Sequence, residues 1–231
     1  VLAIKDNICY KGHKVSASSK ILEGFTSLYS STVVERLLEQ DCIIIGRTNC
    51  DEFAMGASNE NSAYGTVLND ADNTRVSGGS SGGSAVAVQA DMCLAALGSD
   101  TGGSVRQPAA FTGLYGYKPT YGMVSRWGLL AYASSFDQIS PFTNNIADMQ
   151  AIMNVIVGVD EHDASMMQHP SPNFAIAPDK GKKRIAYINE TIFADGISPD
   201  IKNGTLALIE KLKAEGHTVD AIDFPLIDHM V

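Results

Sequence analysis

The spacing of apolar residues along the chain predicts its secondary structure. Residues 32–40 carry apolar side chains three and four positions apart, which indicates an amphipathic helix. Ser31 or Thr32 would be its N-cap, with Glu35 in a capping-box position. Short apolar runs, many of them β-branched, indicate strands at residues 1–5, 42–46, 92–97, 184–188 and 218–222. Further helices are expected at residues 84–90, 105–111, 147–157 and 199–215, with Gly216 ending the last one.

Strands and helices alternate along most of the chain, which favours an α/β fold. We expect a mixed β-sheet core flanked by helices. No repeat or linker interrupts the pattern, so residues 1–231 are predicted to form a single domain. Residues 49–79 form a long irregular stretch with at most a short helix at 52–55, and loops of this length inside a compact domain are usually functional.

The charge balance argues against direct binding of nucleic acid. The chain has 17 basic and 26 acidic residues, a net charge of −9, whereas phosphate neutralisation needs clustered Lys and Arg. One short basic cluster, at residues 180–184, is interpreted as a solvated turn before a strand.

The cysteines and apolar runs indicate a cytoplasmic protein without a metal site or a membrane segment. Cys9, Cys42, Cys50 and Cys93 form no CxxC and no metal-ligand spacing with histidine, as expected of free thiols in a reducing compartment. The apolar stretches are far shorter than the roughly 20 residues that span a bilayer.

Two turns rich in glycine and serine carry the candidate chemistry. The first, GGSSGGS at residues 78–84, leads at once into a small-residue helix, so we interpret it as part of a site rather than as a flexible linker. It lacks the GK[ST] of a phosphate-binding loop. The second, DTGGS at residues 100–104, precedes a helix, and its backbone N–H groups would converge as an oxyanion hole. Ser104 ends this turn, at the position of a nucleophile.

A serine nucleophile needs a base, and lysine suits this sequence better than histidine. None of the five histidines lies in a glycine-rich or catalytic loop context. Lys5 follows an apolar strand, and burial in a site poor in negative charge would lower its pKa towards the neutral, basic form. A lysine at a strand end is, taken alone, more often an ion-pair partner.

Three motifs together resemble the amidase signature family. They are Lys5-Asp6-Asn7, the GGSSGGS run at 78–84 and the DTGGSVRQPA run at 100–109, with 75 residues from Lys5 to Ser80 and 24 from Ser80 to Ser104. The order and separation of the three motifs are more specific than any single one. The resemblance is strongest over residues 1–137, which we expect to hold the signature core.

The resemblance implies a role for each motif residue. Ser104 would be the acylated nucleophile, and Ser80, on a cis peptide bond, would relay a proton between Ser104 and Lys5. Thr101, Gly102 and Gly103 would supply the oxyanion-hole N–H groups. Asp100 and Arg106 would orient the turn by hydrogen bonds, although a plain ion pair is an equal alternative.

Other segments resemble one branch of the family, the glutamine-hydrolysing subunits of tRNA-dependent amidotransferases. These segments are residues 49–62, which include the substrate-pocket candidate Met55, together with 117–122 and 135–138. The resemblance implies that glutamine is the substrate and that no cofactor is held by this chain. Its ammonia would pass to a partner subunit, which uses ATP and Mg²⁺ to amidate Glu-tRNA(Gln) and makes most of the tRNA contacts.

Three alternatives remain open at this stage. The chain could belong to a stand-alone amidase of the same family that acts on another amide. It could also be a catalytically inactive fragment, since the family's chains are about twice as long; we expect weak or no glutaminase activity from this stretch alone, with the glutamine-recognition residues beyond Val231. Finally, Gly78-Gly79-Ser80-Ser81-Gly82 satisfies G-x-S-x-G, a nucleophile elbow with Ser80 attacking and His217 or His229 as base.

Overall fold

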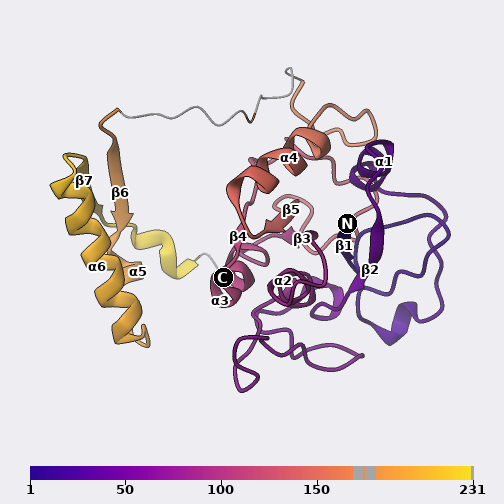
Figure 1. Ribbon diagram of the computed structural model, residues 1–231, viewed down its shortest axis with the longest axis horizontal. Coiled ribbons are helices and arrows are strands. Elements are labelled where there is room, and N and C mark those ends of the chain that lie inside the picture. Colours follow the sequence, from indigo (N-terminus) through magenta and orange to yellow (C-terminus); the bar gives the residue numbers. More distant parts are fainter. Residues whose placement is uncertain (169–173, 175–180, 230–231) are drawn as a thin grey trace. The chain divides into compact units, whose positions relative to one another are not determined.

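A mixed β-sheet organises the first part of the chain. The computed structural model describes residues 1–168, 174 and 181–229. Five strands lie in the order β2-β1-β3-β5-β4 (Figure 1). β1 is parallel to β2 and β3, whereas β5 is antiparallel to both of its neighbours. The strands are β1 (Leu2–Lys5), β2 (Ile44–Thr48), β3 (Ala95–Asp100), β4 (Tyr115–Gly116) and β5 (Gln138–Thr143).

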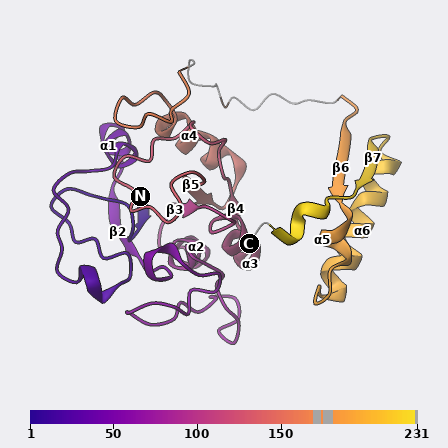
Figure 2. The same ribbon diagram turned by 180° about the vertical axis from the view of Figure 1, so that it is seen from behind.

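Helices cover both faces of this sheet, as Figures 1 and 2 show from opposite sides. Helices α1 (Thr32–Glu39) and α4 (Ile146–Ile156) pack with Leu2 and Ile4 in one apolar core. Helices α2 (Gly82–Gln89) and α3 (Arg106–Thr112) pack with Ala3 in a second core. Side chains alternate between the faces of a strand, so Lys5 follows Ala3 towards the face of α2 and α3.

The remaining elements are short helices and a second, smaller unit. The 3₁₀ helices are η1 (Lys20–Leu22), η2 (Glu52–Ala54) and η3 (Pro225–His229). The chain divides into two compact units, residues 1–176 and residues 177–231. In the second unit, β6 (Arg184–Ile188) and β7 (Thr218–Ile222) form a parallel pair accompanied by α5 (Asn189–Phe193) and α6 (Pro199–Ala214). A single domain over residues 1–231 stays a prediction.

Most predicted elements are confirmed, and the differences have physical causes. The apolar pattern predicts a buried strand at 42–46, but β2 begins at Ile44, and Ile45 is 51% exposed because β2 is an edge strand. The strand expected from residue 92 begins only at Ala95, as β3. The pattern does not predict β5, since its sequence QISPFT lacks an apolar run although all six residues are buried.

The predicted helix ends can be compared with the observed caps. Ser31 is the N-cap of α1, and its hydroxyl accepts a hydrogen bond from the Val34 N–H. Val34 therefore holds the third helical position, so the predicted capping-box role of Glu35 is wrong. Gly216, with φ of +86°, follows the C-cap of α6 as predicted. Within the described residues, no helix is both long and apolar enough to cross a membrane.

Candidate active site

Lys5 lies at the end of β1 and is fully buried. Its Nζ donates to Ser80 Oγ at 2.7 Å and to Ser99 Oγ at 3.0 Å. The contact with Ser80 joins residues that are 75 positions apart in the sequence. The structure thus brings the predicted base and the predicted bridging serine into direct hydrogen-bond contact.

Burial lowers the pKa of Lys5 from 10.5 to about 8, because desolvation disfavours the ammonium form. The negative charges of Asp51, Asp100 and Asp137 act in the opposite direction, as does Cys50. The sequence-based expectation of a site poor in negative charge is therefore wrong. The lowered pKa results from the extent of burial, which outweighs the nearby carboxylates.

The loop that carries Ser80 is held by polar contacts that only the fold creates. The Gly79–Ser80 peptide bond is cis. The Gly79 N–H donates to Gln107 Oε1, and the Ser80 carbonyl accepts from the Asp51 N–H. A Cβ on Gly79 would lie 2.0 Å from Asp51 Oδ2, so a side chain at this position would collide with a buried carboxylate. Glycine is required here by close packing.

The turn at residues 100–104 is organised around the fully buried carboxylate of Asp100. This carboxylate accepts from the N–H groups of Gly103, Val105 and Arg106, and from the Arg106 guanidinium at 2.9 and 3.1 Å. Burial by itself would raise the pKa of Asp100, but these hydrogen bonds outweigh it and the pKa is lowered. Asp100 and Arg106 thus form both the turn hydrogen bonds of the predicted orienting role and the ion pair of its alternative, and the orienting role stays a prediction.

Ser104 is half-buried between β3 and α3, at the end of the turn. Its carbonyl accepts from the Ser81 N–H at 3.2 Å, which joins the two glycine-rich turns through their backbones. Of the three predicted oxyanion-hole residues, Gly103 already donates its N–H to Asp100. The Thr101 hydroxyl donates to Asp137 at 2.5 Å. The roles of Thr101, Gly102 and Gly103 as oxyanion donors stay predictions.

Several residues that contact the site have no role assigned from the sequence. Ser99 contacts Lys5 and also accepts from Asn7 Nδ2 at 3.0 Å. Asp51 supports the Ser80 loop, and its carboxylate accepts from the Asn59 and Asn61 N–H groups. A weak signal exists for Ser99 and Asn7, since each lies in or beside a recognised motif. Asp51 lies in the segment 49–62 that resembles one branch of the family, but its contacts are set by loop geometry and cannot be predicted from that segment.

Asp137 contacts the turn at residues 100–104 through Thr101, and Met55 is the remaining candidate from the sequence. Asp137 is 2% exposed and also lines a cavity of about 310 Å³ with Trp127 and His162. Met55, the predicted substrate-pocket residue, is half exposed at the end of η2, and its role stays a prediction. Within the described part of the chain, no group of three or more His, Cys, Asp or Glu side chains is placed to hold a metal ion.

The nucleophile-elbow alternative finds little geometric support. Ser80 is fully buried against Lys5, and no strand leads into it, since residues 70–77 form turns and a single bridge. His217 Nδ1 accepts from the Lys183 N–H within the second unit. The side chain of His229 lies outside the described part of the structure.

Comparison with known proteins places the chain in a family. The sequence profile of the family described as Amidase matches residues 1–231. The chain belongs to the amidase family. The A subunit of a glutamyl-tRNA(Gln) amidotransferase from Chlorobium phaeobacteroides is 48% identical over 235 residues, which cover 100% of this chain and 49% of the relative. Its counterpart from Prochlorococcus marinus is 51% identical and covers 93% of this chain and 45% of the relative.

A solved structure extends the likeness to the fold of this amidase-family chain. The crystal structure of the glutamyl-tRNA(Gln) amidotransferase A subunit from Thermotoga maritima matches with a TM-score of 0.92 and 43% identity. The match covers 99% of this chain and 50% of that structure. The predicted α/β amidase signature fold is thereby confirmed. The chain spans about half the length of the curated relatives it matches.

Proposed function

We propose that this chain belongs to a glutamine amidohydrolase in which Ser104 is the nucleophile. The observation that carries the proposal is the fully buried Lys5, hydrogen-bonded to Ser80 at 2.7 Å, with a pKa of about 8. A lysine of ordinary pKa is almost wholly protonated at pH 7, whereas about a tenth of the molecules with a pKa of 8 hold the neutral amine. That amine has the free electron pair that a base requires.

The proposed reaction balances its protons through Ser80. Ser104 Oγ attacks the amide carbon of glutamine while its proton passes to Ser80, whose own proton passes to neutral Lys5. Backbone N–H groups of the turn at residues 101–103 stabilise the oxyanion, and those of Thr101 and Gly102 are not among the donors to Asp100. The C–N bond then breaks, and the proton returns along the same path to the departing ammonia. Water attacks the acyl ester in a second cycle, which releases glutamate and regenerates Ser104.

The partner assignments rest on the relatives, which are named as subunits of glutamyl-tRNA(Gln) amidotransferases. We propose that ammonia passes to a partner subunit, which uses ATP and Mg²⁺ to convert Glu-tRNA(Gln) to Gln-tRNA(Gln) within a cytoplasmic heterotrimer. The partner would hold most of the tRNA, consistent with the net charge of −9 on this chain. No cofactor is assigned to this chain, because the Ser104 chemistry uses side chains and backbone groups.

The first test replaces the nucleophile. Ser104→Ala is expected to lower ammonia release from glutamine by at least about 10³-fold, because the acyl ester cannot form. The measurement is coupled ammonia detection on the protein together with any subunit that co-purifies. Ser198→Ala is the matched control, since Ser198 lies in the second unit and makes no side-chain cap hydrogen bond.

Mass spectrometry after treatment with a serine-directed fluorophosphonate locates the reactive residue. An adduct on Ser104 supports the proposal, whereas an adduct on Ser80 would favour the elbow mechanism instead. Turnover of other amides, but not glutamine, by the protein without any partner would identify a stand-alone amidase.

A further inference from the structure

Asp137 is a buried carboxylate placed directly beside the catalytic turn. It precedes β5, and the register of β5 against β3 sets Gln138 opposite Asp100. Because the two strands are antiparallel, the next residues along the chain, Asp137 before β5 and Thr101 after β3, also lie opposite each other. Asp137 is 2% exposed, and none of the ion pairs found among the described residues includes it.

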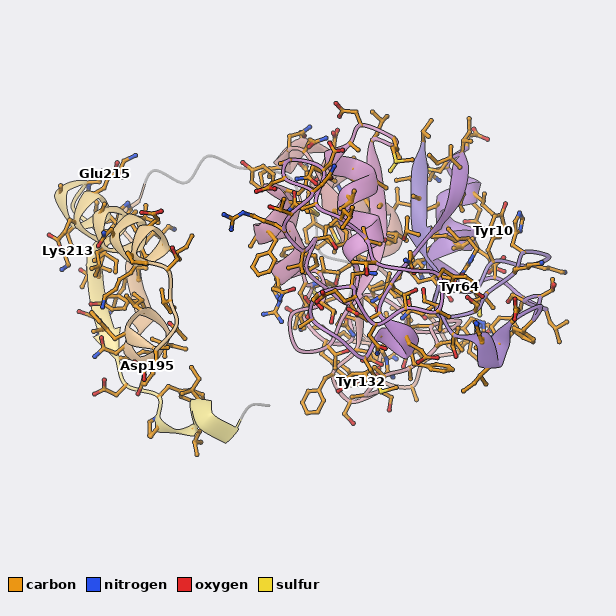
Figure 3. All side chains as sticks on the ribbon, turned by 90° about the horizontal axis from the view of Figure 1, so that it is seen from below. Tyr10, Tyr64, Tyr132, Asp195, Lys213 and Glu215 are labelled. Atoms are coloured by element: carbon orange, nitrogen blue, oxygen red, sulfur yellow. The ribbon has the colours of Figure 1, made fainter. Side chains whose placement is uncertain are left out.

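The charge of Asp137 acts on the Arg126 guanidinium without forming an ion pair with it, so the buried carboxylate needs several hydrogen bonds to offset its desolvation. Asp137 Oδ1 accepts from the Thr101 hydroxyl at 2.5 Å and from the Ala133 N–H at 3.2 Å. Its Oδ2 accepts from the Tyr132 N–H at 2.9 Å. The carboxylate thus ties the turn to the surface loop at residues 132–136, where Tyr132 lies exposed (Figure 3).

The bond to Thr101 restrains the part of the turn whose N–H groups are proposed to stabilise the oxyanion. Threonine is β-branched and stiff at χ1, so fixing its hydroxyl also restrains its backbone. The charge-assisted bond to a carboxylate is stronger than a neutral one. Asp100 holds Gly103 and the start of α3, whereas Asp137 holds the other end of the same turn.

We propose that Asp137 is a positioning residue, which holds the catalytic turn through the Thr101 hydroxyl and supplies part of the negative charge around Lys5. This inference rests on the proposed function of Ser104 and Lys5. The main charges acting on Lys5 are those of Cys50, Asp51, Asp100 and Asp137, all of which raise its pKa against the larger effect of burial. Removing the Asp137 charge should therefore lower the pKa of Lys5 further.

The two effects can be separated with two variants. Asp137→Asn removes the negative charge and places an amide N–H₂ where the donors to Asp137 need an acceptor. Thr101→Val removes only the hydrogen bond between the Thr101 hydroxyl and Asp137. We expect each variant to lower kcat for glutamine by about 10- to 100-fold with KM changed less than about threefold, since a misplaced oxyanion donor acts on the transition state. The double variant should lose about as much as either single one, because both break the same contact.

The pH dependence of kcat/KM distinguishes an electrostatic effect of Asp137 on Lys5 from a purely structural effect, which would leave that pH dependence unchanged. In Asp137→Asn, the acid limb of kcat/KM should shift to lower pH, whereas in Thr101→Val it should stay in place. Asp160→Asn is the matched control, because Asp160 is also buried and accepts from the Ser125 and Thr32 hydroxyls and the His162 N–H, but is not among the main charges acting on Lys5. We expect Asp160→Asn to lower the stability of the fold and to keep the same pH profile of kcat/KM as wild type. Additive losses, or an unmoved limb in Asp137→Asn, would overturn the proposal.

A measurement independent of turnover separates this inference from the proposed function. The NMR titration of ¹³Cε-labelled Lys5, assigned with Lys5→Arg, should give a lower midpoint in Asp137→Asn than in wild type. If Ser104→Ala keeps the ammonia release of wild type, or the fluorophosphonate labels a residue other than Ser104, the proposed function fails while this titration still tests Asp137. If Asp137→Asn does not fold, the Lys5 titration is followed in Asp137→Glu, which keeps the charge. A wild-type midpoint supports the proposal, and an unfolded or shifted Asp137→Glu overturns it.

Discussion

At the scale of single residues, two of the buried ionisable groups at the site have pKa values that are decided by different effects. Lys5 and Asp100 are both fully buried. For Lys5 the desolvation by burial outweighs nearby negative charges and lowers the pKa to about 8. For Asp100 the guanidinium and N–H donors outweigh burial, so its pKa is lowered and it stays ionised. Burial therefore favours the neutral amine of Lys5, whereas the hydrogen bonds to Asp100 favour its carboxylate form.

The pKa of Lys5 predicts how activity changes with pH. Because Lys5 acts as a base only when neutral, kcat/KM should rise about tenfold per pH unit below pH 8 and level off above it. The measurement is the ammonia-release rate at low glutamine concentration between pH 6 and 9.5. The stability of the fold, followed by circular dichroism over the same range, is the control. A flat profile between pH 6 and 8 would remove Lys5 from the role of base.

At the scale of elements, the loop before α2 depends on how closely it packs against residues 51–59. A Cβ on Gly79 would lie 2.0 Å from Asp51 Oδ2 and 2.9 Å from the Asn59 and Ser58 nitrogens. The last two contacts involve backbone, which cannot rotate away. The position of Ser80 relative to Lys5 therefore depends on the absence of a side chain one residue earlier.

Gly79→Ala should consequently lower both stability and activity. We expect a loss of about 2–3 kcal/mol in the free energy of unfolding, typical of an overpacked buried site. Ammonia release should fall by more than the unfolded fraction explains, because the Ser80 hydroxyl is displaced from Lys5. Urea denaturation measures the first effect and steady-state kinetics the second.

Gly46→Ala is the matched control for this variant. Gly46 lies in β2, and a Cβ built on it meets nothing within 4 Å. Stability should therefore change by less than about 0.5 kcal/mol, as is usual for a surface substitution. Equal effects of the two substitutions would mean that packing against Asp51 does not position the loop.

Elements with a regular apolar pattern are predictable from the sequence, and those without one are not. Helix α1 and strands β6 and β7 match their predictions to within a residue because local spacing specifies them. β5 gives no such signal, since its serine, threonine and glutamine become buried only through pairing with β3 and β4. The isoleucines of β2 predict a buried strand. This prediction fails because an apolar run does not reveal whether a strand lies inside the sheet or at its edge.

At the scale of the whole molecule, the proposed catalytic residues and their contacts all belong to the first compact unit. Lys5, Ser80, Ser104 and Asp137 lie within residues 1–176. The second unit, residues 177–231, holds its own parallel strand pair and helices. The first unit should therefore be sufficient to make Ser104 reactive.

A polypeptide of residues 1–176 is expected to react with a serine-directed fluorophosphonate at Ser104. The physical reason is that the sheet, its two apolar cores and the Lys5–Ser80 contact are all present in it. Intact-mass and peptide mass spectrometry measure the labelling, and Ser104→Ala in the same polypeptide is the control. A folded but unreactive polypeptide would show that the second unit is needed to form the site.

The sequence by itself determined the chemical types at the site and their order along the chain. The glycine-rich turns are local features, and the order and separation of the motifs can be counted along the chain, so the resemblance to the amidase signature family indicates Lys5, Ser80, Ser104, Asp100 and Arg106 as candidates. Only the tertiary structure decided which groups meet. Lys5 is buried beside three carboxylates and bonds to Ser99, 94 positions away, while Asp137 holds Thr101 across 36 positions. Desolvation and contacts between segments so far apart leave no local pattern in the sequence, because they arise only when the strands pair.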